Sequence, residues 1–203
     1  MLIDHQQVAP GDLERPPAVL HLVEDLVGPV AGLTVLDLAC RAGAFAAAFH
    51  AAGADVLGIE GRQENLDMAH PGPRYLLGDV RDLDPDVHGT FDVTLCLGIL
   101  YHLGADDAVK LLRAMRAATT GIAVIDTHAG APVDEVHVEG RTFAGQWYGE
   151  PPGLWSSIGN PRSWWFTPDA LDDAARLAGW QVEHHEGIRW PGEPAGRVWR
   201  VLS

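Results

Sequence analysis

The sequence predicts an α/β fold in which a mainly parallel β-sheet is covered by helices on both faces. Short apolar runs, nearly continuous in aliphatic residues, alternate with helical patterns over most of the chain. Strands of that composition are typical of a parallel sheet that is buried on both faces. The last two apolar runs instead show partial in–out alternation, which indicates an antiparallel pair. At 203 residues the chain suits one domain with a sizeable core.

The predicted elements follow one another in a regular order. Residues 16–28 open with two prolines and then place apolar residues at helical spacing, so a helix is predicted there. Further helices are predicted over 43–52, 63–69, 106–118 and 168–178, the last of them capped by Thr167. Strands are predicted over 33–38, 56–60, 75–78, 91–97, 122–126, 180–185 and 197–202. Five strand–helix units thus precede a C-terminal hairpin.

Residues 128–166 interrupt this alternation. The segment is rich in glycine, proline and aromatic residues and shows no clear period, so a long loop is predicted. A loop of that length inside a compact domain is usually functional. We expect a single domain over 1–203, in which this aromatic-rich insert and the N-terminal segment 1–30 cap an active site. Trp147, Tyr148 and Trp155 are predicted to wall a substrate pocket, and Trp164 and Trp165 to form the insert's own core.

Composition narrows the classes of partner. The formal net charge is −14, and a surface of that sign repels phosphate backbones, so no nucleic-acid partner is predicted. Asp4 and Asp12 interrupt the N-terminus where a signal peptide would be apolar, and no apolar run is long enough to span a bilayer, so we expect a cytoplasmic protein without a membrane partner. Cys40 and Cys96 are interpreted as buried, reduced thiols. No metal site and no oligomeric state are predicted.

The first strand-to-helix turn reads VLDLACRAG over residues 35–43. An apolar run ends at Asp37, and a turn of small residues follows, as in loops that bind nucleotides. Glycine is required in such a turn where φ is positive or where a side chain would strike the ligand. Ala39 therefore fits if its φ is negative, and Arg41 fits if its side chain points away from the ligand. Gly43 lets the following helix pack close to the strand.

Three acidic residues close predicted strands at their carboxyl ends, namely Asp37, Glu60 and Asp79. Ligands of open α/β sheets bind at that edge, and a carboxylate at Glu60 can accept hydrogen bonds from both ribose hydroxyls. The alternative is that each acid only caps a helix. A dinucleotide needs close backbone approach at two glycines. Because Ala39 and Arg41 occupy those positions, a Rossmann dehydrogenase is disfavoured.

This order of elements and this turn together resemble the class I fold of S-adenosylmethionine (SAM)-dependent methyltransferases. The resemblance covers residues 20–203 apart from the insert. It implies a three-layer, Rossmann-like, doubly wound sheet of seven strands with an antiparallel last strand. It also implies that Asp79 accepts a bond from the adenine amino group. The cofactor residues that it implies are Asp37, Ala39, Cys40, Gly43, Glu60, Gly61, Asp79, Val80, Leu97 and His102.

Candidate catalytic residues follow the fourth and fifth predicted strands. Histidine suits removal of a proton from the methyl acceptor. His102 is the first candidate for a base and His128 the second, whereas Asp126 is a candidate for orienting a histidine. Tyr101 is assigned to the pocket wall. Two alternatives stay open. One is that His102 only caps a turn or packs beneath the cofactor, and the other is that transfer relies on positioning without a base.

The segments 100–103 (LYHL) and 160–168 (NPRSWWFTP) are similar to those of the branch that contains tRNA wobble-uridine carboxymethyltransferases. The acidic surface argues against carrying over the tRNA substrate. The main hypothesis is methyl transfer from SAM, which leaves S-adenosylhomocysteine (SAH), to a small organic acceptor, at oxygen. One alternative is N-methylation of an amine or peptide. Another, motivated by Arg41, is a degenerate member that binds a nucleoside without catalysis.

Overall fold

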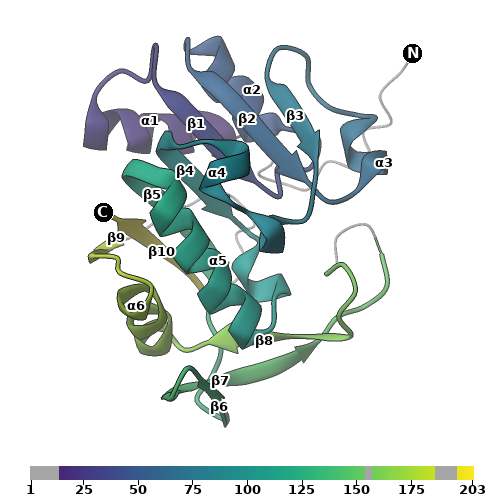
Figure 1. Ribbon diagram of the computed structural model, residues 1–203, viewed down its shortest axis with the longest axis vertical. Helices are drawn as coiled ribbons and strands as arrows, with labels where there is room; N and C mark the ends of the chain where they lie inside the picture. The colour runs from purple at the N-terminus through teal and green to yellow at the C-terminus, as the bar shows by residue number, and fades with distance from the viewer. Residues whose placement is uncertain (1–13, 154–156, 186–195) are drawn as a thin grey trace.

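The computed structural model describes residues 14–153, 157–185 and 196–203, and its centre is a seven-stranded sheet (Figure 1). The strands are β1 (Thr34–Leu38), β2 (Asp55–Glu60), β3 (Arg74–Leu77), β4 (Phe91–Leu97), β5 (Thr119–His128), β9 (Val182–His185) and β10 (Arg197–Leu202). Their order in space is β3-β2-β1-β4-β5-β10-β9. The first five strands pair in parallel, and β10 is antiparallel to both of its neighbours. The predicted fold class is confirmed.

Helices cover both faces of this sheet. They are α1 (Arg15–Val27), α2 (Ala44–Ala51), α3 (Gln63–Leu66), α4 (Pro85–His88), α5 (Ala105–Ala118) and α6 (Pro168–Leu177), with short 3₁₀ turns η2 (Val80–Asp82) and η3 (Leu100–His102). Val19 of α1 and Phe49 of α2 pack in one apolar cluster with Val35 and Val93. The buried face of α5, which includes Leu112, packs in a second cluster. Apolar residues of β1 alternate between the two clusters, as a strand buried on both faces requires.

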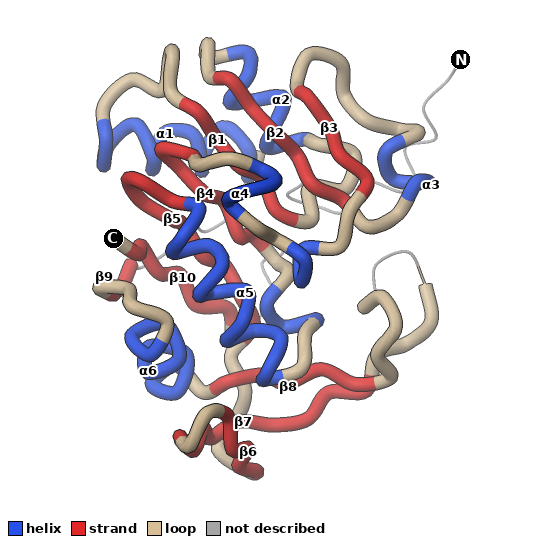
Figure 2. Tube along the Cα trace, in the orientation of Figure 1, coloured by secondary structure: helices blue, strands red, loops and turns tan. Residues whose placement is uncertain are grey.

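The insert forms a second, smaller sheet, which lies below the main sheet in Figure 2. Its antiparallel strands are β6 (Asp134–Val138), β7 (Arg141–Gly149) and β8 (Arg162–Phe166). The prediction of a long loop is therefore wrong. The small sheet is built around Phe143 and Trp164, which are 2% and 0% exposed. Gly145 contributed to the wrong prediction, because a glycine normally weakens a strand. In the structure the glycine is needed inside β7, since a Cβ there would lie 2.3 Å from the Trp165 carbonyl oxygen.

The turn after β1 also differs from the expectation. The φ angles of Ala39 and Arg41 are 55° and 52°, so the condition that Ala39 has a negative φ is not met. Backbone hydrogen bonds hold this shape, because Cys40 donates to the Ile59 carbonyl at 3.1 Å and Gly43 donates back to Cys40 at 2.7 Å. A non-glycine residue in the left-handed region costs about 1–2 kcal/mol. Such strain is concentrated in ligand-binding loops. The strained turn is therefore a candidate ligand-binding loop.

Candidate functional site

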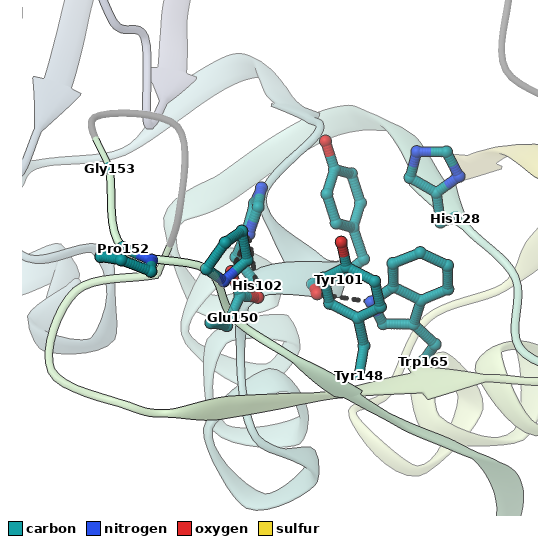
Figure 3. Close-up of a pocket in the computed structure, with 9 residues that line it drawn as sticks. Tyr101, His102, His128, Tyr148, Glu150, Pro152, Gly153 and Trp165 are labelled. Atoms are coloured by element: carbon teal, nitrogen blue, oxygen red, sulfur yellow. Dashed lines mark hydrogen bonds and ion pairs between the residues drawn. The ribbon is translucent and has the colours of Figure 1, made fainter.

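A cavity of about 370 Å³ opens where η3 and the end of β5 meet the small sheet (Figure 3). Its walls come from η3, from the end of β5, and from β7, β8 and the turn after β7. The lining residues are Tyr101, His102, His128, Tyr148, Glu150, Pro151, Pro152, Gly153 and Trp165. Rings and prolines dominate this list, so the cavity suits a small and largely apolar ligand.

His102 and Glu150 form a hydrogen-bonded pair in this cavity. The Nδ1 atom of His102 lies 3.1 and 3.2 Å from the two carboxylate oxygens of Glu150, whose side chain is 3% exposed. Because an ionised carboxylate only accepts, Nδ1 carries the proton and Nε2 of the neutral ring keeps its lone pair. Burial lowers the pKa of His102, while the Glu150 charge opposes that shift. The ring is therefore neutral near pH 7 and able to accept a proton.

The small sheet also fixes the backbone of η3. The indole Nε1 of Trp165 donates to the Tyr101 carbonyl at 2.9 Å, as Figure 3 shows. The side-chain amide of Asn160 donates to the His102 carbonyl at 3.2 Å. Residues distant in the sequence thus position His102 through both its ring and its main chain.

Aromatic rings line one side of the cavity. Tyr148 stacks on Trp165 with centroids 4.5 Å apart, and His128 stacks on Trp165 at 5.0 Å. Trp147, its neighbour on β7, is not among the lining residues and instead packs against Trp164. Successive side chains of a strand point to opposite faces, so the structure brings Tyr148 and Trp165 to the cavity and takes Trp147 away from it. Trp155 lies outside the described residues.

His128 is held differently from His102. Its Nε2 lies 3.3 Å from Nη1 of Arg197, and since a guanidinium only donates, Nε2 is the acceptor. Burial and the Arg197 charge lower the pKa of His128 to about 4. His128 is therefore a weak base whose accepting nitrogen is already engaged.

Asp126 binds arginines rather than a histidine. Its carboxylate, 0% exposed, lies 2.5 Å from Nη2 of Arg15 and 2.7 Å from Nε of Arg197. The prediction that Asp126 orients a histidine therefore requires a correction, because it reaches His128 only through Arg197. Arg15 begins α1, so this ion pair also joins the N-terminal helix to the end of β5.

Glu60 lies at the carboxyl edge of the sheet and holds two turns together. One of its oxygens accepts from the backbone of Arg41 at 3.0 Å, and the other accepts from the backbone of Arg62 at 2.9 Å and from Asn65 at 3.0 Å. The oxygen bonded to Arg41 has a second lone pair that can accept another hydrogen bond. Glu60 can therefore accept a hydrogen bond from one ribose hydroxyl, whereas the sequence suggested bonds from both hydroxyls. One such bond is compatible with a bound nucleoside.

Asp37 and Asp79 both accept backbone N–H groups. Asp37 accepts from Ala46 of α2 at 3.1 Å, and burial raises its pKa to about 7. Asp79 caps η2 by accepting from the Arg81 backbone at 2.9 Å and also binds the Arg81 guanidinium, which lowers the pKa of Asp79. An adenine amino group would have to compete with Arg81 for this carboxylate. The capping alternative therefore describes part of what Asp37 and Asp79 do, whereas Glu60 holds turns.

The remaining cofactor candidates lie around these acids. Cys40 and Val80 are each 6% exposed, and Leu97 is half-buried at the end of β4. Cys40 and Cys96 are free thiols, and burial raises the pKa of each, which makes them poor nucleophiles. No cluster of three metal-ligating residues occurs within the described part of the chain, and none of its helices has the length and hydrophobicity of a membrane span.

Comparison with known proteins agrees with this geometry. Residues 35–120 match a family model described as a methyltransferase domain. The ubiquinone biosynthesis O-methyltransferase of Bordetella avium (strain 197N) is 30% identical over 100 residues, which cover 46% of this chain and 42% of that protein. The corresponding enzyme of Rhodopseudomonas palustris (strain BisB5) is 23% identical over 180 residues, covering 85% of this chain and 67% of that protein. The match thus spans less than half of the Bordetella relative.

Solved structures share the fold. The N-terminal domain of EvdMO1 with SAH bound superposes with a TM-score of 0.74 at 22% identity, covering 93% of this chain and 79% of that one. SAM-bound CalS10, an amino pentose methyltransferase from Micromonospora echinaspora, superposes with a TM-score of 0.66 at 24% identity, covering 96% and 92%. These two likenesses show that the fold is shared. The chain therefore has the class I fold of SAM-dependent methyltransferases, and its residues 35–120 match a methyltransferase domain.

Proposed function

We propose that this chain transfers a methyl group from SAM to a hydroxyl oxygen of a small organic acceptor in the cavity of Figure 3. The observation that carries the proposal is the neutral His102 ring, held by Glu150 with Nε2 available as a base. Bound SAM would supply an already activated methyl group. The work of the chain is then to align the acceptor and to remove its proton.

Two observations favour oxygen over nitrogen as the methylated atom. The cavity is lined mainly by rings and prolines, and the charge of Glu150 is directed at His102 rather than left to bind a cation. The curated relatives are also O-methyltransferases by name. N-methylation is the second candidate, because CalS10 acts on an amino pentose and aromatic faces such as that of Tyr148 attract cations.

The predicted domain organisation and partners become part of this proposal. The small sheet and the turn after β7 form one wall of the cavity, which supports a capping role for the insert. Of the N-terminal segment 1–30, Arg15 reaches the site through Asp126. The net charge of −14 supports a small acceptor rather than a nucleic acid. The likeness of segments 100–103 and 160–168 to the tRNA-modifying branch stays a prediction about ancestry.

Two measurements test the proposed function. Titration calorimetry with SAH should show stoichiometric binding, and methyl-labelled SAM should then label acceptors from a panel of phenols, carboxylic acids, sugars and amines. Label on hydroxyl compounds supports O-methylation, and label on amines alone supports the second candidate. A chain that binds SAH but labels none of the panel would favour the non-catalytic alternative that Arg41 suggested. Absence of SAH binding would overturn the assignment.

The Glu150–His102 pair predicts a pH effect. A base acts in its neutral form, so kcat should fall as pH drops through the pKa of His102. Glu150→Gln removes the charge that raises this pKa, so the acidic limb should move to lower pH and the plateau of kcat should fall. The measurement is kcat against pH for both proteins with the best acceptor of the panel. Glu135→Gln, an exposed change on β6, is the control. An unmoved acidic limb would contradict the pairing.

A further inference from the structure

Residues 157–160, here named the strap, run between the two halves of the site. At its two ends, the Ser157 backbone donates to Glu150 at 3.1 Å and the Asn160 amide donates to the His102 carbonyl at 3.2 Å. Between these ends, the Ile158 carbonyl accepts from Arg81 at 3.1 Å. The strap therefore contacts both the base and the edge of the sheet where the nucleoside fits.

Ile158 lies directly beside that edge. Gly61 follows Glu60 and has no side chain, and a Cβ built there would lie 2.4 Å from Cδ1 of Ile158. The terminal methyl of Ile158 thus occupies the space in front of Gly61, the residue that follows Glu60 in the chain. The Ser157 carbonyl accepts from Arg62 at 3.3 Å, which holds the strap over this turn.

Part of the apolar side chain of Ile158 is exposed to solvent. Ile158 is 38% exposed although it lies against the sheet edge. The guanidinium groups of Arg62 and Arg81 donate to main-chain carbonyls of the strap, so its attachment does not depend on the isoleucine side chain. An exposed aliphatic group fixed beside a nucleoside-binding carboxylate is suited to covering the flat face of a base or the apolar edge of a ribose.

We propose that Ile158 is a cofactor-binding residue that packs on the adenosine part of SAM, in place of the side chain that Gly61 lacks. The inference rests on the proposed function. The strap brings this residue from the insert, so the segment that covers the nucleoside is the same one that holds Glu150 and His102. The insert thereby serves both halves of the reaction.

Calorimetry with two ligands tests this inference. Ile158→Ala should weaken SAH binding by about 3- to 10-fold, since part of an aliphatic side chain loses its contact. 5′-Methylthioadenosine, which lacks the amino-acid part, should lose the same factor. Ile158→Val should retain most of the affinity. Leu26→Ala is the matched control, because Leu26 is similarly exposed at 41% but lies on α1. Thermal melts of all variants check that the fold is intact.

The outcomes separate the inference from the function on which it rests. If the unaltered protein does not bind SAH, the proposed function fails. If it binds SAH and Ile158→Ala binds equally well or more tightly, the inference alone is overturned. A loss for SAH without a loss for 5′-methylthioadenosine would also overturn it, because Ile158 would then act away from the adenosine.

Discussion

His102→Gln is expected to lower kcat by about 10²- to 10⁴-fold, the usual contribution of a positioned base. The ring meets the geometric requirement, because Glu150 fixes its tautomer and Asn160 fixes its main chain. SAH affinity should change little, since the substitution removes a proton acceptor and leaves the turns around Glu60 intact. Initial rates with saturating SAM and the best acceptor, together with calorimetry on SAH, measure both quantities.

Two other histidines serve as controls for this prediction. His128→Gln should cost less than about tenfold, because the pKa of His128 is lowered to about 4 and its Nε2 already accepts from Arg197. His137→Gln should have no effect on the rate, because His137 is exposed on β6 and bonds to Thr142. If His102→Gln retained a rate similar to that of His137→Gln, transfer would rely on positioning without a base.

Asp126→Ala is expected to destabilise the fold strongly. It would leave the part-buried Arg15 and the Arg197 side chain, which is 6% exposed, without the carboxylate between them. Breaking a buried pair in this way costs about 3–5 kcal/mol. For a chain of this size, that loss corresponds to a fall in Tm of about 6–20 °C. Urea denaturation and thermal melting measure the two quantities. Asp126→Asn keeps one acceptor oxygen and should lie between the extremes.

The matched control is an exposed ion pair. Arg113 and Glu139 face each other at 2.6 Å, with side chains 48% and 45% exposed. Surface pairs contribute little because water and salt screen them, so Glu139→Ala should move Tm far less than Asp126→Ala. Equal falls in Tm for the two substitutions would show that the ion pairs of Asp126 with Arg15 and Arg197 stabilise the fold no more than an exposed pair does.

The parts of the fold that the sequence predicted well are those encoded locally. The strand Phe91–Leu97 and the strand Arg197–Leu202 have the predicted bounds, and the Thr167 side chain caps the helix that Pro168 begins. Continuous apolar runs and capping residues act within a few positions of the chain, so a single sequence displays them. The helix predicted over 63–69 ends at Leu66, which shows that helix ends depend on their surroundings.

The parts that could not be predicted depend on pairing across long distances. Glu150 is 48 residues from His102, and no local pattern marks it as the partner of that ring. The strands β6 to β8 are stabilised by pairing with one another. Their individual sequences therefore show no clear strand period. Trp165, which was predicted to be core, lines the cavity, whereas Trp147 packs behind it. Register decides which face of a strand a residue occupies, and register is set by the neighbouring strand.

The sequence by itself determined the order of the strands of the main sheet and the three acids at its carboxyl edge, because apolar periodicity and strand ends are local properties. Tertiary structure decided what those residues do. Cys40 donates to the Ile59 carbonyl and the Arg41 backbone donates to Glu60, and these bonds hold the turn in which Ala39 and Arg41 have positive φ. The insert supplies Glu150 to His102. Hydrogen bonds between distant segments override local preference wherever buried polar groups need partners, and for that reason the chemistry of this site became visible only in the folded chain.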